Sequence, residues 1–109
     1  MTEYAVVDAR TDDGVQILRI YGEVDLTNAV EVRDAISHIA SPDATTIAID
    51  LTETTYLDSS GIATLFHLAE RLNHRRQNLR LVVPLDSPVR RALELADVPQ
   101  TIPIQNALE

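Results

Sequence analysis

A strand leads into a helix within residues 46–75, which read TIAIDLTETTYLDSSGIATLFHLAERLNHR. Thr46 to Leu51 is short and rich in β-branched side chains, as is typical of a strand in the middle of a sheet. A helix from about Ser60 to about Arg75 follows, because apolar side chains recur there at spacings of three and four residues. These side chains are Ile62, Leu65, Phe66, Ala69 and Leu72. The stretch therefore predicts one strand–helix unit of an α/β fold.

Two strands and another helix are predicted upstream of this unit. Tyr4 to Ala9 and Val15 to Tyr21 have the composition of strands, and Asp12-Asp13-Gly14 between them predicts a hairpin turn. A helix then starts near Thr27 or Asn28, since either residue type is a suitable cap. Its predicted apolar side consists of Ala29, Val32, Ile36 and Ile39.

A strand, a helix and a short edge strand are predicted downstream. Leu79 to Pro84 is the strand, and Ser87 caps the helix with Pro88 at its first position. The apolar side of this helix consists of Val89, Ala92, Leu93 and Ala96. Ile102 to Ile104 is an edge strand, because the prolines around it exclude a central one.

The predicted order is ββαβαβα followed by the edge strand. Strands that alternate with helices pair in parallel through right-handed crossovers. We therefore expect a single domain over residues 1–109. Its fold is a small mixed, mainly parallel sheet of four to five strands with three to four helices.

The composition points to an ordinary cytoplasmic domain. Apolar residues make up 45% of the 109 residues, and there is no cysteine to form a disulfide or a thiolate metal site. No apolar run approaches the roughly 20 residues that span a bilayer. Met1-Thr2-Glu3-Tyr4 lacks the basic-then-apolar order of a signal peptide. We expect no membrane association.

The net charge of −8 is spread unevenly along the chain. Residues 1–60 hold 12 acidic side chains and 3 arginines, whereas residues 61–109 hold 5 acidic side chains and 6 arginines. Such an acidic chain is repelled by the phosphates of nucleic acids, which bind basic surfaces. The charge therefore argues against nucleic-acid binding and favours simple solubility and a monomer.

The sequence lacks the motifs of the common catalytic and metal sites. Its three glycines are too few for a phosphate-binding loop, and Leu57-Asp58-Ser59-Ser60-Gly61 lacks the first glycine of a hydrolase elbow. A triad of Ser59, His67 and Asp58 is disfavoured, because His67 would point away from the serine. The three histidines are scattered and predict no metal site. We expect neither an enzyme nor a bound cofactor.

The segment from Asp50 to Ile62 is the best candidate for a binding site. It lies where a parallel strand ends and a helix begins, which is the edge where open α/β sheets place their sites. Backbone N–H groups at a helix start are unpaired and can receive a phosphate. The simpler interpretation is that Asp58 or Ser59 caps the helix and Gly61 allows a close approach of the chain.

Two motifs resemble those of a known family, the STAS domains, named for sulfate transporters and anti-sigma-factor antagonists. Tyr56-Leu57-Asp58-Ser59-Ser60-Gly61-Ile62 resembles the family's Asp-Ser-Ser-Gly signature, which is flanked by apolar residues. Gly22-Glu23-Val24-Asp25-Leu26 is similar to its Gly-Glu-apolar-Asp segment. The resemblance covers roughly residues 4 to 105. It departs from the family at Arg76-Gln77-Asn78, where a glycine pair is common, and Asn78 is expected to supply the left-handed conformation.

The resemblance implies an anti-sigma-factor antagonist that works by partner switching. Such an antagonist binds an anti-sigma factor that is a serine kinase, which uses ATP and Mg²⁺ to phosphorylate it and so ends the interaction. A PP2C-type phosphatase reverses the modification. The implied phosphoacceptor is Ser59, with Ser60 as the alternative. The implied partner-binding residues are Asp25, Thr27, Asn28, Asp58, Ser59, Ser60, Gly61 and Ile62.

Three other interpretations remain open. The domain could be a scaffold in a larger signalling complex, with a serine that is never modified. It could regulate a transporter, although the lack of membrane segments counts against this. Nucleotide binding finds no support in a glycine-poor chain. His67, Leu68 and His74, expected on the outer side of the second long helix, are assigned no family role.

Overall fold

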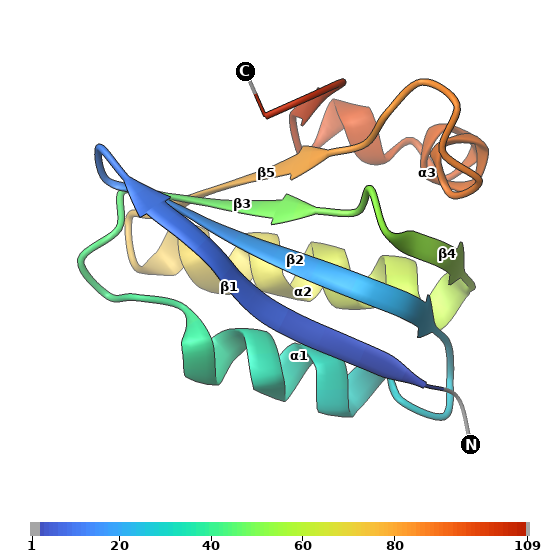
Figure 1. Cartoon of the computed structure of the whole chain (residues 1–109), viewed down its shortest axis with the longest axis horizontal. Coiled ribbons are helices and arrows are strands. Elements are labelled where there is room, and N and C mark those ends of the chain that lie inside the picture. The colour runs from blue at the N-terminus through green and yellow to red at the C-terminus, as the bar shows by residue number, and fades with distance from the viewer. Residues whose placement is uncertain (1–2, 109) are drawn as a thin grey trace.

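Residues 3–108 are described by the computed structural model, in which a six-stranded sheet carries two long helices on one face (Figure 1). The strands are β1 (Tyr4–Asp12), β2 (Val15–Val24), β3 (Thr46–Asp50), β4 (Thr54–Leu57), β5 (Asn78–Val82) and β6 (Ile104–Gln105). The helices are α1 (Ala29–Ile39), α2 (Ser59–His74), α3 (Arg90–Leu95) and the single 3₁₀ turn η1 (Val98–Gln100).

The sheet is mixed and mainly parallel, as predicted. Its strand order is β1-β2-β3-β5-β6, and only the β1–β2 pair is antiparallel. The β1–β2 hairpin turns at Asp13 (φ 50°) and Gly14 (φ 80°). Positive φ at both central residues is the turn geometry that matches the twist of a hairpin, so the predicted turn is confirmed.

Strand β4 was not predicted, which is why the sheet has one strand more than expected. It pairs in parallel with the end of β2, where β2 extends past β3 (Gly22 opposite Thr54, Val24 opposite Leu57). Its residues TTYL show a buried–exposed–exposed–buried pattern rather than the alternation that marks a strand. The strand conformation of β4 depends on its pairing with β2. The sequence of β4 alone does not predict a strand.

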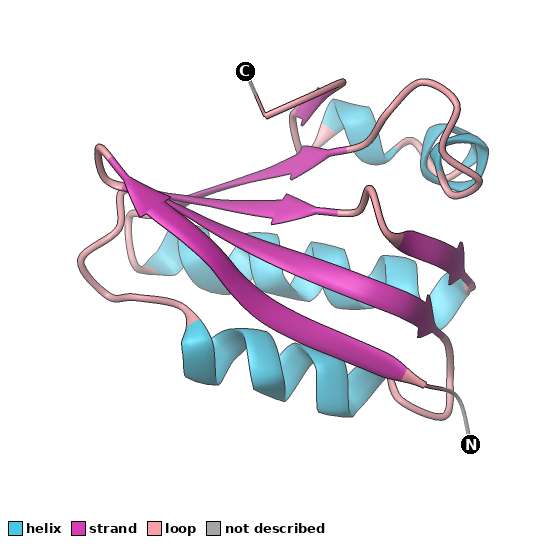
Figure 2. Cartoon of the chain, viewed as in Figure 1, coloured by secondary structure: helices cyan, strands magenta, loops and turns pink. Residues whose placement is uncertain are grey.

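Both long helices bury an apolar side against the same face of the sheet (Figure 2). Leu68 of α2 is only 2% exposed, so its expected place on the outer side of the helix was wrong. The physical reason is that α1 lies beside α2, as the bonds from Thr64 Oγ1 to the Ala29 carbonyl (3.4 Å) and from Arg71 to Ser37 indicate. The apolar side of α2 therefore has to face a neighbouring helix as well as the sheet.

Several element ends differ from the prediction. The third helix begins at Arg90, because Ser87 Oγ accepts the N–H of Val89 (3.2 Å) in a turn that precedes it. The last strand is Ile104–Gln105, while Ile102 is buried in the core. The left-handed residue after α2 is Arg76 (φ 59°) rather than Asn78, which begins β5.

The opposite face of the sheet is more polar. A small apolar cluster of Ile17, Ala48 and Val82 lies there, with Leu108 packed against it. None of the helices in the described part of the chain is long and apolar enough to cross a membrane.

Candidate functional site

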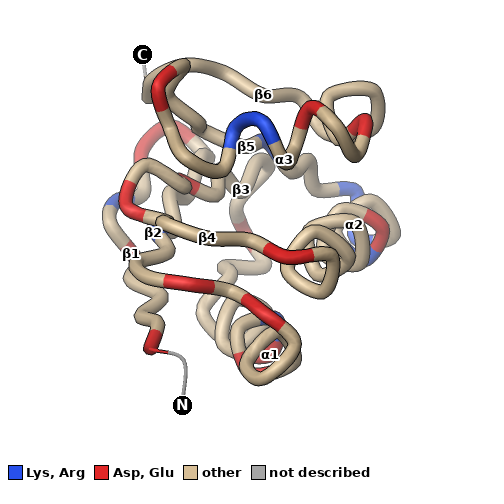
Figure 3. Tube along the Cα trace, turned by 90° about the vertical axis from the view of Figure 1, so that its right-hand side faces the viewer, with Lys and Arg blue, Asp and Glu red and all other residues tan. Residues whose placement is uncertain are grey.

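The turns that follow β2 and β4 lie side by side at one edge of the sheet. Val24 and Leu57 are paired residues at the ends of these strands, and the Asp58 N–H donates to the Val24 carbonyl (3.3 Å). Figure 3 looks onto this edge, where the turn into α1 and the turn into α2 face the viewer. Two segments about 30 residues apart in sequence therefore form one surface, as the candidate site requires.

Asp58 holds the two turns together. Its Oδ1 accepts the N–H groups of Ser60 (2.9 Å) and Gly61 (3.0 Å), which makes it the N-cap of α2. Its Oδ2 accepts the N–H of Leu26 (3.0 Å) in the turn after β2. One carboxylate thus caps the helix and fixes the neighbouring turn against it.

The capping role changes what the helix start can offer to a phosphate. The sequence predicts unpaired N–H groups at this end of α2. In the structure, Asp58 already occupies those of Ser60 and Gly61, and the Ile62 N–H donates to the Asp58 carbonyl (3.0 Å). A phosphate placed beside Ser59 would meet a carboxylate where free donors were expected.

Gly61 is required by the close approach of β2 to the start of α2. A Cβ at this position would lie 2.8 Å from the Val24 carbonyl oxygen and 3.1 Å from Leu57 Cδ2. A contact as short as 2.8 Å to a backbone atom requires part of the structure to shift. The predicted close approach is confirmed.

Hydrogen bonds link Asp25, Thr27 and Asn28 in the turn after β2. The Asp25 carboxylate accepts the N–H (2.9 Å) and the hydroxyl (2.6 Å) of Thr27. Asn28 does not cap α1 with its side chain. Instead its Oδ1 accepts the Asp25 N–H (2.9 Å), and its Nδ2 donates to the Glu23 carbonyl (2.8 Å). Asn28 is 3% exposed, so it stabilises the turn from the interior and does not itself offer a surface to a partner.

Ser59 is the first residue of α2 and is exposed, whereas Ser60 is half-buried. Within residues 3–108 neither hydroxyl takes part in a hydrogen bond of the site, so neither is needed as a cap. Ile62, the last predicted site residue, is partly buried against the core. Of the two serines, Ser59 is the more accessible to another protein.

Three exposed apolar side chains surround this edge and were missing from the predicted site. Leu26 (78% exposed) is in the turn after β2, Val30 (58%) is in the first turn of α1, and Tyr56 (50%) is on β4. Single exposed apolar residues are common on protein surfaces, but these three lie on segments that meet at one edge of the sheet. Val30 could have been noticed, because it lies off the apolar side of its helix. The placement of the other two depends on the strand pairing.

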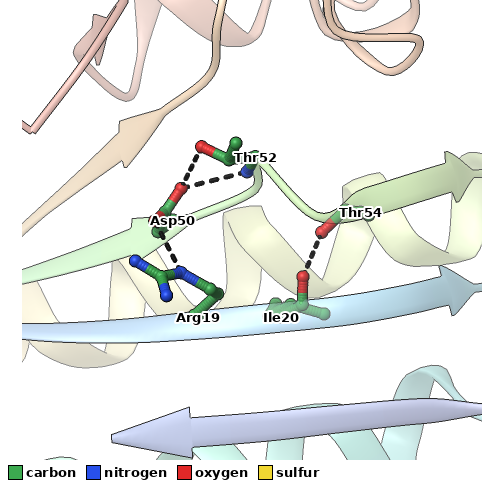
Figure 4. A network of polar contacts seen from close by, with 5 residues as sticks. All are labelled: Arg19, Ile20, Asp50, Thr52 and Thr54. Atoms are coloured by element: carbon green, nitrogen blue, oxygen red, sulfur yellow. Dashed lines mark hydrogen bonds and ion pairs between the residues drawn. The ribbon is translucent and has the colours of Figure 1, made fainter. Parts of the chain in front are cut away.

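A second polar network lies on the other face of the sheet and has a structural role (Figure 4). The Asp50 side chain, 3% exposed, accepts Arg19 Nε (2.9 Å) and both the N–H (3.0 Å) and the hydroxyl (2.5 Å) of Thr52. Tyr21 and Asp50 beside the Arg19 guanidinium raise its pKa. Thr54 Oγ1 donates to the Ile20 carbonyl (2.8 Å). These bonds guide the chain from β3 into β4.

The site is thus the edge formed by β2 and β4 in an α/β sheet, with an exposed serine at a helix start. The family model for the STAS domain matches residues 6–109. The chain belongs to the STAS domain family.

The relatives of this chain carry the names of anti-sigma-factor antagonists. It is 30% identical over 97 residues to the anti-sigma-F factor antagonist RsfB of Mycobacterium tuberculosis, covering 88% of this chain and 77% of RsfB. It is 27% identical over 100 residues to an anti-sigma-B factor antagonist of Listeria monocytogenes, covering 92% and 86%. The solved structure of an anti-sigma factor antagonist from Mycobacterium paratuberculosis shares the fold, with a TM-score of 0.75, 24% identity, and 99% and 88% coverage.

Proposed function

We propose that this domain is an anti-sigma-factor antagonist that binds an anti-sigma factor at the β2–β4 edge and is released by phosphorylation of Ser59. The names of its relatives support the antagonist role. The observation that carries the site is the exposed Ser59 at the start of α2, at an edge whose segments also carry the exposed Leu26, Val30 and Tyr56. The partner in this proposal is a serine kinase that supplies ATP and Mg²⁺.

The three exposed apolar side chains give the partner groups to bury. Interfaces typically depend on a few central apolar or aromatic side chains that become fully desolvated. Leu26, Val30 and Tyr56 are exposed in the free domain and are held by segments that Asp58 and Asn28 fix in place. The surface is thus largely preformed, which reduces the entropy that binding has to overcome.

Phosphorylation would oppose binding through charge. A phosphate adds close to two negative charges next to Asp58, and Asp25 lies in the adjoining turn. Because Asp58 already holds the N–H groups of Ser60 and Gly61, the phosphate finds little compensation in the domain itself. A loss of about 3 to 4 kcal/mol of binding free energy corresponds to association some hundreds-fold weaker. The cap and the core remain, so the fold persists, and a PP2C-type phosphatase would restore binding.

The test compares Ser59→Ala with Ser59→Asp as baits for partner proteins, with Ser60→Ala as the matched control. We expect Ser59→Ala to retain an ATP-binding kinase that Ser59→Asp loses. We also expect phosphate to be incorporated into Ser60→Ala by that kinase and not into Ser59→Ala. If Ser59→Ala were still fully phosphorylated, Ser60 would be the phosphoacceptor. If both Ser59 baits retained the same partner proteins, the domain would be an unmodified scaffold and not a phosphorylation switch.

A further inference from the structure

A groove lies between α1 and α2, away from the β2–β4 edge. It has a volume of about 490 Å³ and is lined by residues of both helices and by Arg75 just beyond α2. Ser59 and Arg71 are 12 residues apart on α2, which corresponds to about 18 Å along the helix axis. The volume falls within the range of roughly 300–1,000 Å³ that small-molecule sites occupy.

The groove concentrates positive charge in an acidic protein. Arg33 of α1, Arg71 of α2 and Arg75 just beyond α2 line it, which is three of the nine arginines in a chain with 17 acidic residues. Glu70 is the one carboxylate on its lining. His67 and His74 also line it.

These arginines are poorly neutralised within the protein. Among residues 3–108, Arg71 and Arg75 form no ion pair, and the only one of Arg33 is a 3.6 Å contact with Asp34, which is 66% exposed. Arg33 Nε is buried and has no hydrogen-bond partner in the same range. Carboxylates outnumber arginines nearly two to one in this chain, so the composition offers enough carboxylates to pair with every arginine. The groove therefore holds one buried donor without a partner, on Arg33, beside the exposed guanidinium groups of Arg71 and Arg75.

One of the guanidinium groups, that of Arg71, is held by a hydrogen bond to α1. Arg71 Nη1 donates to Ser37 Oγ across the groove (3.0 Å), which orients Arg71 and leaves its other N–H groups available. Residues 67, 71 and 74 recur at helical spacing and so share one side of α2. The buried Leu68 lies beneath them, where α2 meets α1.

We propose that this groove binds an oligophosphate, an anion with several linked phosphate groups. Guanidinium groups match phosphate oxygens with paired hydrogen bonds, and several of them together suit a ligand with several phosphates. The attraction of the C-terminal end of a helix for cations explains some positive charge on the last turn of α2. It does not explain Arg33, which lies in the middle of α1. The site is separate from Ser59 and is independent of the partner-switching proposal.

The test titrates the full chain with inorganic tripolyphosphate by calorimetry and by amide NMR shifts, at constant ionic strength of about 0.1 M, where long-range attraction is partly screened. We expect saturable binding, with shifts centred on residues 33, 67, 71, 74 and 75. Inorganic monophosphate at equal ionic strength is expected to bind much more weakly. Equal affinity for the two anions would overturn the requirement for linked phosphates.

Matched variants separate the groove from general charge. Arg71→Gln and Arg75→Gln are each expected to weaken tripolyphosphate binding roughly tenfold, equivalent to about 1.4 kcal/mol. Arg91→Gln, which removes an exposed arginine of α3 outside the groove, should bind as the parent does. Circular dichroism confirms that each variant is folded. Equal loss in all three variants, or no saturable binding by the parent chain, would overturn the proposal.

Discussion

At the scale of single residues, Gly61 is the position where both the fold and the site require the absence of a side chain. Alanine favours a helix over glycine by about 1 kcal/mol, so Gly61→Ala would normally stabilise α2. Here the added Cβ would lie 2.8 Å from the Val24 carbonyl oxygen, an atom of the backbone that cannot rotate away. We expect Gly61→Ala to lower the free energy of unfolding by about 1–3 kcal/mol, as overpacking does.

Urea denaturation measures this change. Ser59→Ala is the control, because it lies in the same turn of α2 but is exposed, and exposed substitutions usually stay within about 0.5 kcal/mol. If Gly61→Ala were as stable as the parent, β2 and α2 would be free to move apart at the site.

At the scale of elements, the network of Arg19 and Asp50 connects β2, β3 and the turn into β4. Removing the guanidinium leaves a carboxylate that is 3% exposed without its counter-charge. We expect Arg19→Met to cost about 1–3 kcal/mol of unfolding free energy, less than for a fully buried pair because Arg19 is 31% exposed.

A second substitution tests whether charge is the cause. Asp50→Asn removes the charge but keeps an oxygen that can accept from Thr52, so Arg19→Met/Asp50→Asn should be more stable than Arg19→Met alone. Arg10→Met, at an exposed arginine of β1, is the control and should change little. A double variant less stable than Arg19→Met would mean that the hydrogen bonds of Asp50, rather than its charge, dominate.

The elements that the sequence predicted are those with a local signal. The hairpin, α1, α2, β3 and β5 have turn residues or apolar periodicity, and all are present. β4 and the inner position of Leu68 depend on which strand or helix lies next to them, so their own sequence could not reveal them. The same holds for the site. Asp58 and Gly61 were found from their motif, whereas Leu26 and Tyr56 are brought to the same edge only by the pairing of β2 with β4.

At the scale of the whole molecule, the two candidate surfaces differ in chemistry and in place. The β2–β4 edge combines apolar side chains with the carboxylates of Asp25 and Asp58, and Figure 3 shows acidic residues in both turns of this edge. The groove between α1 and α2 collects arginines instead. Protein binding and anion binding would therefore use separate faces, and substitutions on one should leave the other unaffected.

The last prediction concerns the exposed apolar side chains at the β2–β4 edge and their part in partner binding by the intact domain. Val30→Ser on α1 and Leu26→Ser beside it remove side chains that are 58% and 78% exposed, so neither should change the free energy of unfolding by more than about 0.5 kcal/mol. If the partner buries them, each should weaken its binding by at least about tenfold, equivalent to about 1.4 kcal/mol. Val7→Ser is the control, because Val7 is 43% exposed on β1 opposite Arg19, on the face of the sheet that the long helices leave open. Calorimetry or surface plasmon resonance with the captured kinase measures all three. Loss of binding in Val7→Ser but not in Val30→Ser would move the interface to that open face and remove the β2–β4 edge from the proposal.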